Sequence, residues 1–376
     1  MTIWITGAHG MLGTDLSTLA RRQFAQIDTV ISEELPQTLS HKTSSSSETT
    51  ANRLNLHKNL VRPCRLVVSD DLLTSSSETT ILETDRETDI TDSAVVSDFI
   101  EKNKPDIIIN CAAYTAVDNA ESEKELNYKL NCTGIKNLGE CSAQAGIPII
   151  HISTDYVLNG SEPNQLRETD PINPQNEYGR AKAEGELALA KSNPKHIIVR
   201  TAWLYGINGK NFVKSMLNLM RTKEKISVVG DQLGNPTWTF DLSRALLKIA
   251  HQLTSQQINL YQLNSPQPQQ LNPQQPQYGI YHFSGDGITS WHGFAVEIQK
   301  QAIAKGLLQK SIEIAAIPSS EWKSPANRPL WSALDKTKIK NNFGVEVPAW
   351  QTSLSQYLDL ELAATQPHST IPNHTL

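Results

Sequence analysis

The sequence has few cysteines and no residue pattern typical of a metal site. Only four of its 376 residues are cysteines, Cys64, Cys111, Cys132 and Cys141. They show no C-x-x-C spacing and have no metal ligands at the right interval, which predicts reduced thiols rather than a disulfide framework or a zinc site. The histidines of predicted elements also lack ligand spacing, so we expect packed or hydrogen-bonded rings at His151, His282 and His292.

Charge and long apolar runs are scarce as well. Charged residues make up 19% of the chain, and the formal net charge is −5. Because no basic stripe is present, the composition predicts neither a nucleic-acid partner nor an anionic membrane surface. No apolar run approaches the ~20 residues that span a bilayer, and no basic segment with a long apolar core begins the chain. We therefore expect a cytoplasmic protein that binds small molecules.

Strands and helices are predicted to alternate along much of the chain. Residues 2–6 have the pattern of a buried strand, and the segment after the following glycines has helical periodicity. Further strands are predicted in PDIIIN, PIIHIST and HIIVRTAW, with helices between them, one of which covers about 178–191. This order is typical of right-handed βαβ units. It predicts the α/β class and a Rossmann-type doubly wound parallel sheet.

The turn after the first strand contains three glycines spaced by threes. Gly7, Gly10 and Gly13 lie between TIWIT and the predicted helix. Backbone N–H groups at a helix start carry partial positive charge, and glycines allow a pyrophosphate to approach them closely. The position between strand and helix favours a dinucleotide site over a simple tight turn.

A second set of residues indicates hydride-transfer chemistry. Tyr178 and Lys182 are four residues apart in a predicted helix and so share a face. There a lysine ammonium can lower the phenol pKa and hold a nicotinamide ribose. Thr154 is predicted at the carboxyl end of a strand, where open α/β sheets bind ligands. Its hydroxyl can hydrogen-bond a substrate carbonyl while Tyr178 donates the proton.

Two low-complexity tracts interrupt the α/β order. The Ser/Thr-rich tract at about 33–80 cannot bury enough apolar area to order itself, so we expect a partly disordered insert. A Gln/Pro-rich insert is expected at about 255–277. We predict an NAD(P)-binding Rossmann domain at 1–206, a smaller C-terminal substrate-binding lobe formed mainly by 207–362, and a flexible tail at 363–376.

Together these motifs resemble the extended short-chain dehydrogenase/reductase superfamily, which uses the G-x-x-G-x-x-G spacing. Longer segments resemble the dTDP-4-dehydrorhamnose reductase family within it: NCAAYTAVDNAE at 110–121, STDYVLNG at 153–160, YGRAKAEGE at 178–186, RTAWLYG at 200–206, GKNFV at 209–213, DQLGNPTW at 231–238 and RPLWSALD at 328–335. The resemblance covers nearly the whole chain outside the two low-complexity tracts. It implies reduction of the C4 keto group of dTDP-4-dehydro-6-deoxy-L-mannose to dTDP-L-rhamnose by NADPH or NADH. It also leaves room for a Mg²⁺ ion and a homodimer.

The resemblance further implies roles for individual residues. Thr154, Tyr178 and Lys182 are implied as catalytic, with Tyr178 as the proton donor. No residue is assigned to a metal. The dTDP-sugar is assigned to Thr154, Asp155, Trp203, Asn211 and Arg328. The dinucleotide is assigned to residues of the glycine turn, the second strand's end and the later loops and helices: Gly7, Gly10, Met11, Leu12, Gly13, Asp85, Arg86, Asp89, Ile90, Ala112, Ala113, Tyr114, Asn131, Tyr178 and Lys182.

The second strand of the sheet decides the cofactor expectation. From the residues alone it is ambiguous among segments around 27–32, around 66–70 and 81–85. The resemblance favours 81–85, which places Asp85 and Arg86 at the adenosine ribose. A carboxylate there disfavours a 2′-phosphate and an arginine favours it, so both cofactors stay open with a lean to NADPH. A strand at 27–32 would instead place Glu33 at the ribose and favour NADH.

Three other functions are known for proteins that resemble this sequence. Sugar-nucleotide 4,6-dehydratases carry an acidic residue after Thr-Asp, and that position is Tyr156 here. Nucleotide-sugar epimerases share the Thr, Tyr and Lys and keep NAD bound, but the reductase-like segments beyond residue 200 argue against them. The regulatory subunit of methionine adenosyltransferase also resembles these reductases and acts as a binding partner. The intact catalytic residues leave this last alternative open.

Overall fold

The computed structural model describes residues 1–33, 79–160, 162–262 and 277–365. Its contacts divide the chain into one unit formed by Met1–Arg22 and Thr79–Leu376 and a second unit, Gln23–Glu78. The sheet, the smaller lobe and the candidate site all belong to the first unit. The described part of the second unit is the continuation of helix α1 to Glu33.

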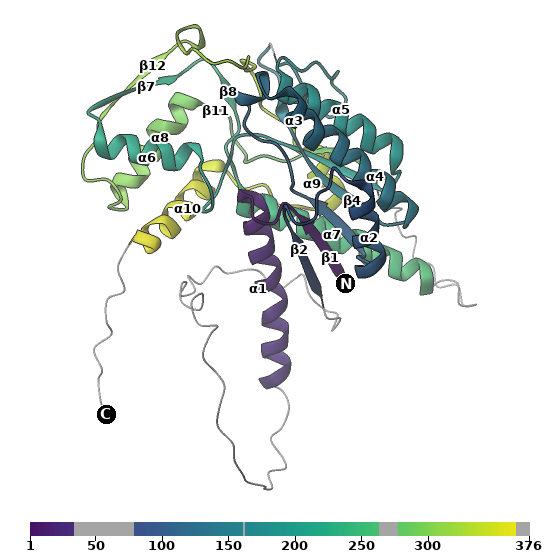
Figure 1. The fold of residues 1–376 in the computed structure, drawn as a ribbon. Coiled ribbons are helices and arrows are strands. Elements are labelled where there is room, and N and C mark those ends of the chain that lie inside the picture. The colour runs from purple at the N-terminus through teal and green to yellow at the C-terminus, as the bar shows by residue number, and fades with distance from the viewer. Residues whose placement is uncertain (34–78, 161, 263–276, 366–376) are drawn as a thin grey trace, which may run out of the picture. The chain divides into compact units, whose positions relative to one another are not determined.

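A six-stranded sheet forms the centre of the first unit (Figure 1). All of its strand pairs are parallel, and the order is β10-β5-β4-β3-β1-β2. The strands are β1 (Thr2–Thr6), β2 (Thr80–Thr84), β3 (Ile107–Asn110), β4 (Ile149–Thr154), β5 (His196–Thr201) and β10 (Gly279–His282). Short runs of Ile and Val, such as IIIN in β3 and IIV within β5, suit such strands, because helices cover both faces. The predicted α/β doubly wound sheet is therefore confirmed.

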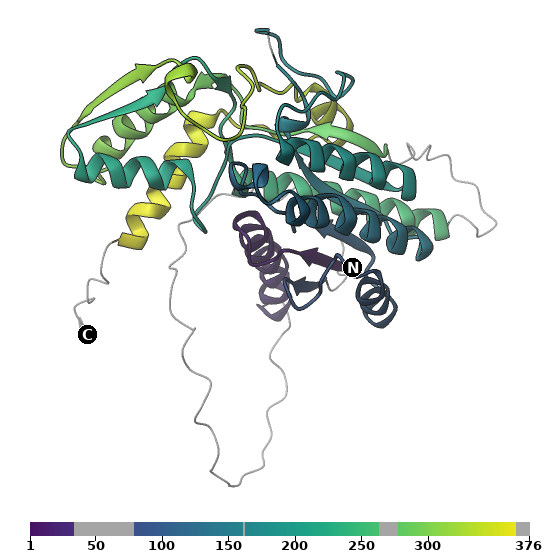
Figure 2. The same cartoon turned by 45° about the horizontal axis from the view of Figure 1, so that its top comes forward.

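The helices that pack on this sheet come mostly from the crossovers between strands. One set, α2, α4 and α5, packs side by side (Figure 2), whereas α7 packs against β3 and α9 against β10. A π-helical turn at Lys129–Thr133 joins α3 to α4. Short 3₁₀ turns lie at η1 (Asn119–Glu121), η3 (Asp155–Val157) and η4 (Ser319–Glu321). The helix bounds are α1 (Met11–Glu33), α2 (Ser93–Asn103), α3 (Lys124–Tyr128), α4 (Gly134–Gln144), α5 (Glu177–Ser192), α7 (Thr239–Gln262) and α9 (Thr337–Phe343).

The second strand is β2, the segment that the resemblance favours. It pairs with β1 in a register that places Ile81 opposite Ile3. Residues 27–32 lie in α1, so the alternative that places Glu33 at a strand end is wrong. The third possibility, at 66–70, lies outside the described residues, as do most of the predicted inserts and tail.

The smaller lobe is built from segments after residue 203. Its helices and strands are α6 (Phe212–Thr222), α8 (Trp291–Ala304), α10 (Trp350–Thr365), β7 (Lys225–Val229) and β12 (Glu313–Ile317), with the short strands β6 (Leu204–Tyr205), β8 (Leu233–Gly234), β9 (Thr237–Trp238) and β11 (Thr289–Ser290). Phe294, Trp350 and Tyr357 are central to its apolar core. The chain also returns to the main sheet after the lobe begins, because β10 pairs with β5. The domain boundary at 206/207 thus stays a prediction.

A buried ion pair fixes α5 to the sheet. Arg200 on β5 donates two hydrogen bonds to Glu186 on α5, 2.9 Å from Nε to Oε1 and 2.7 Å from Nη2 to Oε2. Both side chains are 1% exposed. Removal of one partner would leave the other charge buried and unpaired, which costs far more than the loss of an exposed pair.

We expect Glu186→Ala to lower the free energy of unfolding by about 3–5 kcal/mol, because it leaves the Arg200 guanidinium without its partner. Urea denaturation followed by circular dichroism measures the change. The matched control is Glu140→Ala, which removes the carboxylate of an exposed i,i+4 pair with Lys136 and should cost about 0.5 kcal/mol or less. Equal losses in the two variants would contradict the assignment of the buried pair as a major stabilising contact.

Candidate active site

The glycine turn has two different kinds of glycine. Gly7 has a φ of 66°, and a Cβ there would lie 2.5 Å from the backbone nitrogen of Ala112. A Cβ at Gly13 would lie 2.1 Å from the oxygen of Gly7. At Gly10, however, a Cβ would meet only that same oxygen, at 3.3 Å, and the residue is exposed. Gly7 and Gly13 therefore shape the turn, while Gly10 leaves its outer side open.

This turn lies at the topological switch point of the sheet. From β1 the chain continues to β2 on one side, and β3 then lies on the other side of β1. In open α/β sheets ligands bind at this point, outside the carboxyl ends of the strands. The open side of Gly10 beside the first N–H groups of α1 fits a pyrophosphate, so the residues present fit a dinucleotide. Of the next two residues, Met11 is half-buried and Leu12 is buried.

The loop after β3 forms the neighbouring wall. Ala112 and Ala113 begin two residues after the end of the strand, and Ala112 lies against Gly7. The buried amide of Asn131 accepts a hydrogen bond from the Tyr114 backbone nitrogen at 3.1 Å and donates to its oxygen at 2.9 Å. The amide group of Asn131 thus holds the loop in place, and its predicted contact with a cofactor stays a prediction.

At the end of β2 the predicted residues separate into two groups. Asp85 lies 3.3 Å from Nδ1 of His9 in the glycine turn, and Arg86 is exposed. The Asp89 carboxylate accepts hydrogen bonds from Thr91 within its own turn, and these bonds lower its pKa. Ile90 is buried in the apolar core. Asp85 is therefore placed beside the glycine turn, and Arg86 is the next residue along the chain.

Tyr178 lies in the first turn of α5. The Asn176 side chain caps this helix by accepting a hydrogen bond from the Gly179 nitrogen at 2.7 Å. Burial raises the pKa of the Tyr178 phenol, the nearby Asp155 carboxylate raises it further, and a hydrogen bond with Thr154 opposes both. The ring also packs edge-on against Tyr156. The phenol is thus held in its neutral, proton-carrying form.

Thr154 ends β4 and lies in contact with the next residue. Its hydroxyl donates to Oδ1 of Asp155 at 2.9 Å and accepts from the Tyr156 nitrogen at 3.2 Å. Burial raises the pKa of Asp155 to about 7, against the hydrogen bonds that lower it. The structure therefore brings together Thr154, Asp155 and Tyr178 as the sequence predicts.

Lys182 lies one turn further along α5 and is fully buried. Its Nζ donates to the Ile152 backbone oxygen at 2.6 Å and lies 3.3 Å from Nε2 of His151. Burial lowers the pKa of Lys182 to about 8, although Glu186 and Cys111 act in the opposite direction. The expected packed, hydrogen-bonded ring at His151 is confirmed. Its contact with Lys182 could not be predicted, because no spacing rule connects a strand residue to a helix residue 31 positions later. A polar ring within the apolar run PIIHIS was the available signal.

Three of the residues predicted to bind the sugar line one cleft together with residues of the lobe. A small cleft is lined by Asp155, Tyr156, Trp203, Gln232, Trp291, Arg328, Pro329 and Ser332. Trp203 has a left-handed φ of 49°, and its ring stacks on Trp291 with centroids 3.6 Å apart. Arg328 forms a two-point ion pair with Asp118, at 3.0 Å for each contact. These positions place Trp203 and Arg328 beside Asp155.

Asn211 lies elsewhere. It caps α6 by accepting a hydrogen bond from the Lys214 nitrogen at 3.1 Å, and its amide donates to the Gly206 oxygen at 2.7 Å. The amide also lies 3.9 Å from the sulfur of Met11. This side chain joins the linker after β6 to the glycine turn and does not line the cleft. Its predicted contact with the sugar stays a prediction.

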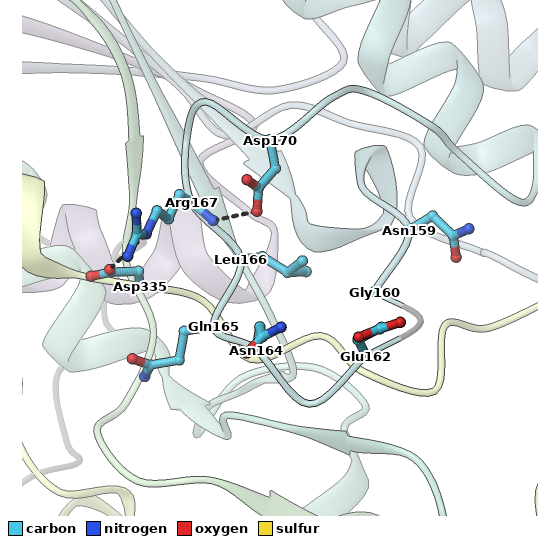
Figure 3. Close-up of a pocket in the computed structure, with 9 residues that line it drawn as sticks. All are labelled: Asn159, Gly160, Glu162, Asn164, Gln165, Leu166, Arg167, Asp170 and Asp335. Carbon is cyan, nitrogen blue, oxygen red and sulfur yellow. Dashed lines mark hydrogen bonds and ion pairs between the residues drawn. The ribbon is translucent and has the colours of Figure 1, made fainter.

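Another cavity lies apart from all the predicted site residues. It is formed by the loop after η3 and by Asp335 (Figure 3), and its lining, most of it polar, comprises Asn159, Gly160, Glu162, Asn164, Gln165, Leu166, Arg167, Asp170 and Asp335. The Arg167 nitrogen donates to Asp170 at 2.8 Å within this loop. We assign no catalytic role to it, because no nucleophile or proton donor of the predicted site faces it. Among the described residues, no group of three or more His, Cys, Asp or Glu could hold a metal ion, and no helix is long and apolar enough to cross a membrane.

Comparisons with known proteins agree with this geometry. The family model "RmlD substrate binding domain" matches residues 68–362. The dTDP-4-dehydrorhamnose reductase of Aggregatibacter actinomycetemcomitans is 39% identical over 268 residues, which cover 71% of this chain and 85% of that protein. The reductase of Salmonella typhimurium strain LT2 is 35% identical over 266 residues, 70% of this chain and 82% of that protein.

Solved structures with the same name are also similar. The dTDP-4-dehydrorhamnose reductase of Clostridium acetobutylicum ATCC 824 has a TM-score of 0.70 and 33% identity, and the match covers 96% of this chain and 100% of that one. The reductase of Bacillus anthracis strain Ames, solved in complex with NADP, has a TM-score of 0.69 and 29% identity, with 96% and 99% covered. The matched length, the sequence identity and the fold together show that the chain belongs to the dTDP-4-dehydrorhamnose reductase family.

Proposed function

We propose that this protein reduces the C4 keto group of dTDP-4-dehydro-6-deoxy-L-mannose to give dTDP-L-rhamnose, with a reduced nicotinamide dinucleotide as the hydride source. The observation that carries the proposal is the meeting of Tyr178, Thr154 and Lys182 at the carboxyl edge of the sheet. The names of the relatives support the sugar and the reaction.

The residues divide the reaction between them. The nicotinamide cofactor supplies the hydride that forms the new C–H bond at C4. Tyr178 donates its phenolic proton to the C4 oxygen as that oxygen gains charge, and Thr154 turns its hydroxyl from Asp155 to the same oxygen. The positive charge of Lys182, one turn further along α5, would favour the phenolate left after proton transfer.

We assign the dinucleotide and the dTDP-sugar to different parts of the first unit. We propose that the α/β part up to about residue 206 holds the dinucleotide and that the lobe segments after it cover the dTDP-sugar. The Trp203–Trp291 stack offers an apolar wall, and Arg328 offers a guanidinium to a diphosphate. Because Arg328 is already paired with Asp118, the sugar nucleotide has to compete with that carboxylate.

The cofactor preference depends on the end of β2. Asp85 faces His9 and would accept hydrogen bonds from ribose hydroxyls, whereas the exposed Arg86 is free to meet a 2′-phosphate. This pair supports use of both cofactors, with a preference for NADPH. Neither the proposed homodimer nor a role for Mg²⁺ rests on a contact in this chain.

The reaction itself is tested with purified protein, the dTDP-4-keto sugar and either NADPH or NADH. We expect the absorbance at the nicotinamide band to fall in proportion to the sugar added. No oxidation of either cofactor would refute the proposed function. NAD retained through purification, with turnover that needs no reductant, would indicate an epimerase. Co-purification with a synthetase and no turnover would indicate a regulatory subunit.

The proton donor is tested by Tyr178→Phe. We expect kcat to fall by about 10²–10⁴-fold, because the proton has no other positioned donor. Fluorescence titration should show NADPH affinity within a few fold of the original. Tyr128→Phe, at an exposed phenol on α3, is the matched control and should keep full activity. Retention of most activity by Tyr178→Phe would show that Tyr178 is not the acid.

Cofactor preference is tested by Arg86→Ala. We expect the KM for NADPH to rise about tenfold, which corresponds to one lost charge-assisted contact, and the KM for NADH to change less than twofold. Arg221→Ala, at an exposed arginine of α6, controls for the general loss of positive charge. An equal change for both cofactors would remove Arg86 from the 2′-phosphate site.

A further inference from the structure

A chain of buried polar side chains runs through the sheet to Lys182. Thr6 on β1 donates to Oδ1 of Asn110 on β3 at 2.5 Å, and Nδ2 of Asn110 lies 2.8 Å from Nδ1 of His151 on β4. Nε2 of His151 lies 3.3 Å from Nζ of Lys182. All four side chains are at most 1% exposed. This series of side chains therefore connects three adjacent strands to the helix that carries the proposed proton donor.

The backbone fixes the direction of this chain. Oδ1 of Asn110 also accepts from the backbone nitrogen of Ala112 at 3.2 Å. That nitrogen is only a donor and its direction is fixed by the backbone, so a reversed amide would hold two donors against each other. The Lys182 ammonium, in contrast, can rotate its N–H groups away from a donor at Nε2. The amide NH₂ therefore faces Nδ1 of His151, which has to be unprotonated. A neutral imidazole in this position carries its proton on Nε2, the atom that faces Lys182.

We propose that His151 is a positioning residue for Lys182: its Nε2–H, fixed by Asn110, denies the ammonium an acceptor on that side, so that the remaining N–H groups of Lys182 stay directed to the cofactor. This inference rests on the proposed function for the identity of that cofactor. It extends the site beyond the residues that touch the reactants, to a residue that acts on them through Lys182.

The other groups around Lys182 do not have the orienting effect that we propose for His151. From β4, the Ile152 oxygen accepts one hydrogen bond. From the loop after β3, the half-buried Cys111 interacts electrostatically with the amine, and desolvation raises the pKa of its thiol to about 12. On α5 itself, Tyr178 lies one turn before and Glu186 one turn after, but Glu186 is paired with Arg200. Burial and the Lys182 charge both lower the pKa of His151, which keeps the ring neutral.

The proposal predicts a pH dependence of cofactor binding. Lys182 loses its charge as the pH rises through its pKa of about 8, so NADPH affinity should fall above that pH. Asn110→Asp replaces the amide donor by an acceptor, which places the His151 proton on Nδ1 and turns Nε2 into an acceptor for the ammonium. We therefore expect the pH at which NADPH affinity falls to rise by about one unit. At a pH well above the original pKa, the variant should then bind NADPH about tenfold more tightly than the unchanged protein. The new carboxylate can still accept from Thr6 and Ala112, and circular dichroism of the variant checks that the fold is retained.

A double-mutant cycle separates the tautomer from the added charge. Asn110→Asp also brings a negative charge nearer to Lys182, and this effect does not need the imidazole. In a His151→Phe background the same substitution should therefore move the pH dependence by less than half as much. An equal shift with and without the imidazole, or no shift in Asn110→Asp, would overturn the proposal.

The tautomer is measured directly on the full chain with ¹⁵N-labelled histidine. Long-range ¹H–¹⁵N correlations at pH 7 should show His151 protonated on Nε2, and on Nδ1 in Asn110→Asp. The His151→Phe spectrum identifies the signal by its loss. Protonation on Nδ1 in the unchanged protein would overturn the proposal. Neither readout uses the sugar, so the expected tautomer together with no turnover of the dTDP-sugar would refute only the proposed function.

Discussion

The site depends on the docking of α5 against the parallel sheet. Residues four apart share one face of a helix, so Tyr178, Lys182 and Glu186 form a single stripe directed at β4 and β5. Glu186 fixes the stripe through a buried ion pair with Arg200, and Lys182 fixes it through a hydrogen bond to the Ile152 oxygen. Because these two contacts fix α5 against the sheet, they also determine the position of Tyr178 beside Thr154.

The dinucleotide side depends on close backbone contacts rather than on charges. Gly7 lies so close to the chain after β3 that no side chain fits there, and Gly13 lies equally close to Gly7. The same helix start is joined to the lobe linker, because Asp15 on α1 accepts hydrogen bonds from Asn208 and Thr239. Asp15 therefore connects the helix that follows the glycine turn to Asn208 and Thr239.

Local patterns in the sequence predicted the sheet and the proximity of Thr154 and Tyr178, because both follow from periodicity and spacing. The position of β2 needed the family resemblance, since an insert separates it from α1. Contacts between distant segments could not be predicted from either source. The return of β10 to the sheet, the Trp203–Trp291 stack and the link from Asn110 through His151 to Lys182 each join residues far apart in the chain. Asn131 and Asn211 had predicted ligand roles, and the structure shows their amides bound to backbone groups of the protein.

Transfer of a labelled hydride tests the central claim most directly. The protein is incubated with the dTDP-4-keto sugar and NADPH that carries deuterium at the transferred position of the nicotinamide, and the sugar product is analysed by mass spectrometry and NMR. We expect a product one mass unit heavier than that formed with unlabelled NADPH, with deuterium at C4 of the sugar. A sugar product without deuterium, or no conversion of the keto sugar, would contradict it.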